Sequence, residues 1–158
     1  YAGEMARLDP PPRLGRYPGE LNEAFWNSRG VTVVIAPWNF PLAIPTGMVA
    51  AALVAGNPVL FKPSERSSAM GYQLARILLD AGVPKGLLQY VPGGPELGRE
   101  LVESAAVRTI AFTGSKDVGL GIMHERARRI HAELAVQSEP LHGTTITLML
   151  PHHKRTAT

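Results

Sequence analysis

The sequence predicts an α/β fold, Rossmann-like, with a parallel sheet and helices on both faces. Between residues 31 and 129, four short apolar strands are each followed by a segment of helical periodicity, with Gly- or Pro-containing turns between them. Strands that alternate with helices form parallel sheets, because each helix returns the chain to the same end of the sheet. Hydrophobic residues make up 45% of the 158 residues and charged residues 18%, so the chain can build a core.

The elements follow in order after a lead-in. Residues 1–29 are rich in Pro and Gly and lack periodicity, which predicts an extended arm. Residues 31–35 form the first strand and 42–55 the first helix, mostly past Pro45. The uncharged stretch 30–61 is not a membrane span, since four prolines leave no helical piece near the roughly 20 residues that a span needs.

The remaining units repeat this arrangement. Strand 59–61 ends at Lys62 and leads to a helix over 67–81 that Gly82 closes. Strand 87–91 passes through a glycine turn into a third helix, and strand 109–112 leads into a fourth that ends near Arg129. Beyond residue 130 the character changes, and 144–150 alternates like a half-buried strand. We therefore divide the chain into 1–29, 30–130 and a tail over 131–158 with one strand.

Composition excludes several classes of function. The chain has no cysteine, which rules out disulfides, thiolate metal sites and thiol nucleophiles within it. Sixteen basic and thirteen acidic residues give a charge of +3 without a basic stripe, so we expect no nucleic-acid partner. The adjacent His152 and His153 lack carboxylate partners at ligand spacing, so we expect no metal site. No targeting segment or membrane partner is recognised, and we expect a cytoplasmic protein.

Ligands of parallel sheets bind at the carboxyl ends of the strands, so the turns there are the candidate site. The first turn (PWNFP, 37–41) projects Trp38 and Asn39, and an amide there can stabilise an oxyanion, a role worth about 10²–10³ in rate. The alternative is that Trp38 packs in the core and Asn39 satisfies the loop backbone. In the second turn (KPSE, 62–65), Lys62 and Glu65 can hold a sugar diol. Alternatively, a serine caps the next helix and Glu65 complements its dipole.

The third and fourth turns, 93–98 and 112–115, place small residues just before helices, where phosphates can bind. Neither is a dinucleotide or Walker fingerprint, and each alone could be only a turn.

Together, the motifs PWNFP, KPSE and FTGS make residues 31–130 resemble the cofactor-binding region of the aldehyde dehydrogenase superfamily. The YPGE sequence at 17–20, with 33–48 and 113–119, most resembles the branch that oxidises glutamate semialdehyde in proline catabolism, the pyrroline-5-carboxylate dehydrogenases. The resemblance implies NAD and a small aldehyde as ligands of a homo-oligomeric full-length parent. Residues 30–130 would then be a partial NAD-binding domain.

The resemblance also implies roles for single residues. Asn39 would be the oxyanion donor to the aldehyde oxygen, while Lys62 and Glu65 would hold the adenosine ribose. A carboxylate at residue 65 should repel a 2′-phosphate, so we expect a preference for NAD over NADP. The remaining cofactor-binding residues would be Gly94, Gly114 and Ser115 along the adenine and pyrophosphate, and Ile35, Pro37 and Trp38 along the dinucleotide.

The catalytic cysteine and glutamate of such enzymes are absent, and neither Glu133 nor Glu139 lies in the family's Glu-x-Gly-Gly motif. We therefore expect an inactive fragment with an incomplete sheet. Two alternatives stay open. The first is a non-catalytic nucleotide-binding or interaction module. The second is a chimeric or misjoined reading frame, since residues 136–151 resemble the end of a sensor histidine kinase ATPase domain; a phosphotransfer-signalling fragment would rest on that tail alone.

Overall fold

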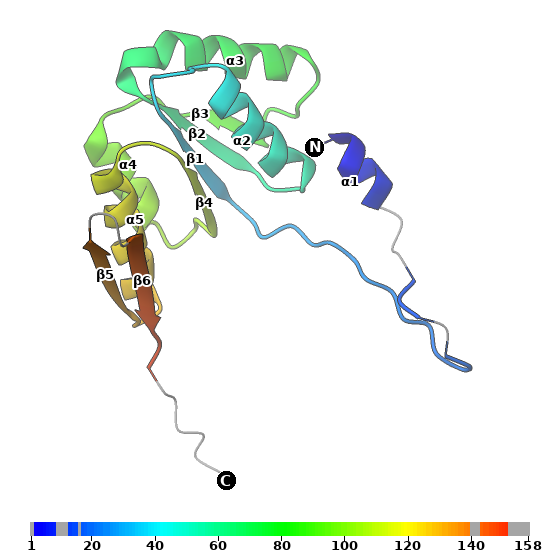
Figure 1. Ribbon diagram of the computed structural model, residues 1–158. Coiled ribbons are helices and arrows are strands. Elements are labelled where there is room, and N and C mark those ends of the chain that lie inside the picture. Colours follow the sequence, from blue (N-terminus) through cyan, green and yellow to red (C-terminus); the bar gives the residue numbers. More distant parts are fainter. Residues whose placement is uncertain (1, 9–12, 16, 140–142, 152–158) are drawn as a thin grey trace. The chain divides into compact units, whose positions relative to one another are not determined.

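The computed structural model describes residues 2–8, 13–15, 17–139 and 143–151 (Figure 1). The chain forms two compact units, Tyr1–Thr113 and Gly114–Thr158. This division falls earlier than the boundary that the sequence suggested near residue 130. The reason is that the last helix packs on the hairpin that follows it, so both belong to the second unit.

The first unit is built on a four-stranded parallel sheet. β1 (Thr32–Ala36) pairs on one side with β2 (Val59–Pro63) and on the other with β4 (Thr109–Phe112). β3 (Leu88–Tyr90) extends the sheet beyond β2, which gives the order β3-β2-β1-β4. The predicted α/β class with a parallel sheet is confirmed, and Figure 1 shows the four strands side by side.

Helices cover both faces of this sheet. α2 (Ala43–Val54) and α3 (Ser68–Asp80) pack on one face, where Phe61 is fully buried. α4 (Pro95–Glu103) contacts β1 from the other face, onto which Lys62 points because successive strand residues alternate. The core on the face of α2 and α3 consists of Val34, Ala36, Val49, Val59, Phe61, Leu74, Ala75 and Leu88.

α3 lies unusually close to the end of β2. A Cβ atom at Gly71 would stand 2.7 Å from Cγ of Pro63, so only glycine permits this approach. The single 3₁₀ turn η1 (Glu65–Ser67) joins the two elements, and Ser67 is buried beneath it. The backbone that carries Glu65 is thereby fixed on both sides.

Asn57 ties the entry of β1 to the end of α2. Its Oδ1 accepts hydrogen bonds from the backbone N–H groups of Arg29, at 2.7 Å, and Gly30, at 3.0 Å. Its Nδ2 donates to the carbonyl groups of Ala52 and Ala55, each at 3.3 Å. One amide side chain therefore satisfies four backbone groups on two segments.

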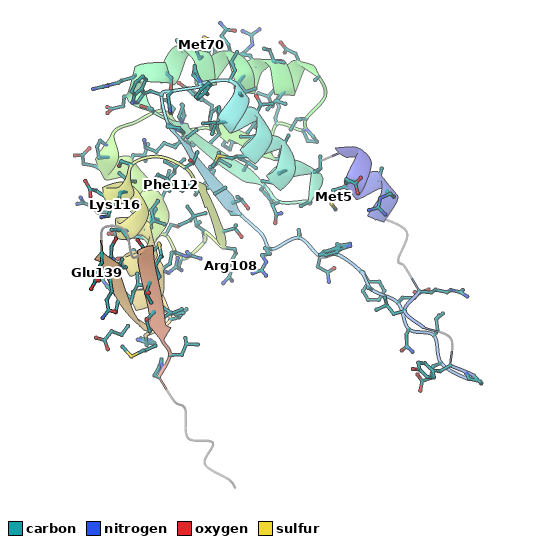
Figure 2. All side chains as sticks on the ribbon, in the orientation of Figure 1. Met5, Met70, Arg108, Phe112, Lys116 and Glu139 are labelled. Atoms are coloured by element: carbon teal, nitrogen blue, oxygen red, sulfur yellow. The ribbon has the colours of Figure 1, made fainter. Side chains whose placement is uncertain are left out.

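The lead-in differs in part from the extended arm that we predicted. Residues Ala2–Leu8 form a helix, α1, because they are mostly good helix formers and Glu4 pairs with Arg7 at 2.7 Å. Residues 13–15 and 17–29 form no helix or ladder; the chain turns back at residues 18–19, and an isolated antiparallel bridge pairs Arg13 with Glu23. Figure 2 draws the side chains of this segment as sticks, and its large apolar residues are exposed; they are Leu14, Tyr17, Leu21, Phe25 and Trp26. Residues 9–12 lie outside the described part.

The second unit contains α5 (Lys116–Arg129) and an antiparallel hairpin of β5 (Glu133–Glu139) and β6 (Gly143–Met149). We predicted the second of these strands but not the first. β5 has one β-branched residue, so its extended form depends on pairing with β6 rather than on its own sequence. Within the described residues, no helix is long and apolar enough to cross a membrane.

We predict that Asn57→Ala lowers the free energy of unfolding by about 1–3 kcal/mol, because it leaves backbone groups of both segments without partners. Urea or thermal unfolding of the two proteins measures the change. Asn27→Ala is the matched control, since Asn27 is exposed on the arm and should change stability by less than about 0.5 kcal/mol. Equal losses in the two variants would contradict the role of Asn57.

Candidate functional site

The carboxyl edge of the sheet places the turn after β2 at the centre of the site. β2 lies between β3 and β1, so η1 lies between the turns that follow those two strands. Ile35 of β1 is the register partner of both Lys62 on β2 and Phe112 on β4. These three side chains therefore share the face that α4 covers.

Lys62 is a buried cation at this edge, with 7% of the residue exposed. Its aliphatic stem passes α4 where that helix has no side chain: a Cβ at Gly98 would lie 3.4 Å from Cε of Lys62. Burial lowers the pKa of Lys62 from its ordinary value of 10.5, and the negative charge of Glu65 opposes the shift in part.

The ammonium group of Lys62 is free to bind a ligand. In the part of the chain that the structure describes, the side chain of Lys62 takes part in no hydrogen bond or salt bridge, and no fully buried side-chain nitrogen or oxygen lacks a partner. The ammonium group must therefore still reach solvent. A cation held in this way suits a neutral or anionic oxygen brought by a ligand.

Gly94 opens the space beside Glu65. A Cβ at residue 94 would lie 3.3 Å from Oε1 of Glu65 and 3.0 Å from Oε2 of Glu96. Two carboxylates at one position repel phosphate but accept hydrogen bonds from hydroxyl groups. Lys62, Glu65 and the gap at Gly94 thus fit the diol of a ribose. Gly94 is also the N-cap of α4, without a side-chain cap of its own.

The serines near this turn do not act as helix caps. Neither Ser64, before η1, nor Ser67, before α3, makes a side-chain cap hydrogen bond; Oγ of Ser67 lies 3.4 Å from the carbonyl oxygen of Ser64 instead. The structure therefore gives no support to a serine cap as the purpose of this motif.

The turn after β1 projects Trp38 and Asn39 outward. Trp38 is 57% exposed, which is incompatible with the alternative that it packs in the core, and Asn39 is exposed beside it. Pro37 is half-buried at the end of the strand. The guanidinium carbon of Arg66 lies 5.6 Å from the centroid of the Trp38 ring, within the range of cation–π interactions.

Gly114 and Ser115 belong to the second unit, and there they begin α5. Ser115 is the N-cap, and its Oγ accepts a hydrogen bond from the backbone N–H of Val118 at 3.4 Å. Both residues are exposed. Their predicted contact with a dinucleotide stays a prediction, while the first unit brings Lys62, Glu65 and Gly94 together.

Three residues of this edge were not predicted from the sequence to belong to the site. Glu96 and Gly98 lie in the turn 93–98, but only the structure shows that Glu96 lies beside Gly94 and that Gly98 lies against Lys62. Arg66 directly follows the KPSE motif, and nothing in the sequence signals its stacking on Trp38.

A groove of about 580 Å³ lies on the opposite face, between α2 and the strands β1 and β4. It contains none of the predicted site residues, so we do not assign it to the site. Among the described residues, no three acidic or histidine side chains gather as metal ligands.

Comparison with known proteins gives a consistent family. The family model described as "Aldehyde dehydrogenase family" matches residues 1–140, past the boundary that we placed near 130. The chain is 46% identical over 132 residues to the 1-pyrroline-5-carboxylate dehydrogenases of Geobacillus sp. (strain WCH70) and Anoxybacillus flavithermus (strain DSM 21510 / WK1). Each alignment covers 83% of this chain and 25% of the relative. The chain therefore spans about a quarter of these relatives' length.

Solved structures agree. Proline utilization A (PutA) from Bdellovibrio bacteriovorus, inactivated by N-propargylglycine, matches with a TM-score of 0.77 and 50% identity, over 80% of this chain and 14% of that one. PnpE in complex with nicotinamide adenine dinucleotide matches with a TM-score of 0.71 and 35% identity, over 79% and 26%. An NAD-dependent benzaldehyde dehydrogenase from Corynebacterium glutamicum matches with a TM-score of 0.70 and 33% identity, over 80% and 29%.

We predict that Glu65→Gln lowers the pKa of Lys62 further, because it removes the charge that opposes the effect of burial. Heteronuclear NMR of the lysine side chains, with Lys62→Arg to assign the signal, measures this pKa. Glu103→Gln is the control and should leave it unchanged. A rise of the pKa in Glu65→Gln would contradict the geometry.

The same shift has a consequence for stability. Since the unfolded chain binds the Lys62 proton more tightly, the stability of the fold should increase as pH rises from the lowered pKa toward 10.5. Lys62→Arg stays charged over that range and should lose this increase.

Proposed function

Since the chain belongs to the aldehyde dehydrogenase family, we propose that its 158 residues form the dinucleotide-binding part of an NAD-dependent aldehyde dehydrogenase. The full protein would oxidise an aldehyde to a carboxylic acid. Its substrate would be glutamate semialdehyde, which it would convert to glutamate in proline catabolism; the similarity to 1-pyrroline-5-carboxylate dehydrogenases supports this choice.

One observation carries the proposal: the Lys62 side chain, mostly buried and without a hydrogen bond or salt bridge, lies at a strand end beside a carboxylate and a glycine gap. Lys62 and Glu65 would hold the two hydroxyls of the adenosine ribose, the amine donating and the carboxylate accepting. The Cβ-free position at Gly94 leaves room for the sugar between Glu65 and the start of α4. Such charged hydrogen bonds contribute about 1.5–3 kcal/mol each.

The remaining residues would orient the rest of the ligand. Ile35 and Pro37 at the end of β1, with the exposed ring of Trp38, offer apolar surface along a dinucleotide. Gly114 and Ser115 would line the path of the adenine and pyrophosphate at the start of α5.

Asn39 would act on the substrate rather than on the cofactor. Its exposed amide can donate a hydrogen bond to the aldehyde oxygen as negative charge develops there. Bound NAD would supply the hydride acceptor. The 158 residues contain no thiol to attack the aldehyde carbon, so binding and orientation are the steps that this chain's own residues can perform.

We predict that the chain binds NAD more tightly than NADP, because the carboxylate of Glu65 repels a 2′-phosphate. Isothermal titration calorimetry with both nucleotides measures the preference. Glu65→Gln should weaken NAD binding by about tenfold or more, since it removes a charged hydrogen bond to the ribose, and should narrow the preference.

Glu100→Gln is the matched control, because Glu100 is an exposed acid on the same helix as Gly98. It should bind both nucleotides like the parent chain. Equal affinity of the parent chain for NAD and NADP would overturn the role of Glu65.

We also predict that the purified chain does not form NADH when given NAD and an aldehyde, because it has no cysteine. Absorbance at the NADH band over a range of aldehydes tests this. Aldehyde-dependent NADH formation would refute the assignment of this chain to binding alone.

A second candidate is a module that keeps the fold without catalysis. If NAD raises the unfolding temperature of the chain, the binding site is retained; no shift would favour a structural or interaction role.

The hypothesis that the tail, residues 131–158, comes from a misjoined reading frame stays a prediction. The family match includes residues 131–140 and leaves 141–158 outside it. Sequencing source DNA across the codons for Arg126 to Val136 tests the misjoined-frame alternative, which a continuous dehydrogenase frame would exclude.

A further inference from the structure

Two consecutive side chains of η1, those of Glu65 and Arg66, lie beside two different loops. A 3₁₀ turn has three residues, so successive side chains point about 120° apart. Ser67 is buried beneath the turn, Glu65 lies beside the gap at Gly94, and Arg66 lies over the ring of Trp38. Since β2 lies between β3 and β1, the turn touches the loops on both sides of it.

The loop that Arg66 touches contains a strained residue. Phe40 has a φ of 55°, in the left-handed region that bulky side chains rarely adopt. Its carbonyl group accepts a hydrogen bond at 3.3 Å from the backbone N–H of Ile44, at the start of α2. Strained conformations of this kind persist only where surrounding contacts hold them.

Asn39 lies between the stacked residue and the strained one. On one side Trp38 is largely exposed, so the core does not hold its ring, and the guanidinium of Arg66 is the contact over it. On the other side Phe40 is fixed by its bond to Ile44. The contact between Arg66 and Trp38 therefore restrains the residue next to Asn39 on its N-terminal side.

We propose that Arg66 is a positioning residue that couples the ribose site to the Asn39 turn. This inference rests on the proposed function, because it takes Lys62 and Glu65 to hold ribose hydroxyls. The backbone of η1 is already held, so a sugar bound by Glu65 would order the exposed side chains of the turn and keep Arg66 against Trp38. By linkage, a Trp38 turn held in place raises the affinity of the ribose site by the same factor.

The test uses Trp38 as its own reporter. The chain has two tryptophans, so Trp26→Phe, on the exposed arm, leaves Trp38 as the single one. Adenosine monophosphate is the probe, because it carries the adenosine ribose and lacks the nicotinamide half. Acrylamide quenching of Trp38 is measured with and without this nucleotide, and equilibrium dialysis of the same samples measures its binding.

We expect the nucleotide to reduce quenching of Trp38 in the Trp26→Phe chain. Adding Arg66→Gln should increase quenching in the free chain, abolish the response to nucleotide, and weaken nucleotide binding by about 2- to 5-fold, the range that a partly exposed cation–π contact provides. Arg66→Lys keeps a cation and should restore part of the response. Arg76→Gln, which changes an exposed arginine of α3, should behave like the parent.

The possible failures are distinct. If adenosine monophosphate does not bind, the ribose site is wrong, and both the proposed function and this inference fall. If it binds while the quenching of Trp38 stays constant, the coupling is refuted and the ribose site stands. If Arg66→Gln matches the parent in every measurement, Arg66 does not position the turn.

Discussion

The parallel register of β1 and β2 is the constraint on which the site depends. It places Ile35 opposite Lys62 and leaves η1 between the turns of two neighbouring strands. Strand side chains alternate between faces, so a slip of one residue would turn Lys62 toward α2 and α3 and bring Phe61 to the face of α4. The close packing of Gly71 against Pro63 and the burial of Phe61 both oppose such a slip. Packing on the face of α2 and α3 thus determines that Lys62 points toward α4.

The three strand-end turns of the first unit differ in the charge of their side chains. The turn after β2 and the start of α4 carry carboxylates around a lysine and suit hydroxyl groups, whereas the turn after β1 exposes an amide and an aromatic ring. The negative charges of Glu65 and Glu96 disfavour a phosphate beside them. The carboxylates and the aromatic ring thus lie on different loops of the first unit.

Most of the sheet and part of the site could be predicted from sequence, because both rest on local patterns. Short β-branched runs, glycine turns and helical periodicity predict the four strand–helix units, and the charged motif at the end of β2 contains Lys62 and Glu65, which the structure places at one edge of the sheet. Contacts between segments could not be predicted. The stacking of Arg66 on Trp38 depends on which strands are neighbours, and β5 is extended because β6 pairs with it. α1 was not predicted because Gly3 and the three consecutive prolines at 10–12 obscure a run in which six of seven residues have good helix propensity.

The four hydrogen bonds of Asn57 also make the position of β1 independent of the conformation of the arm before it. Residues 17–28 before β1 expose large aromatic side chains and contribute nothing to the hydrophobic core, so their conformation can change at low energetic cost. Oδ1 of Asn57 accepts hydrogen bonds from the N–H groups of Arg29 and Gly30, immediately before β1 begins. The start of β1 is therefore held by the loop that follows α2 and not by residues 17–28 alone. The central strand, and the turn with Asn39 at its far end, would keep their place while the arm moved.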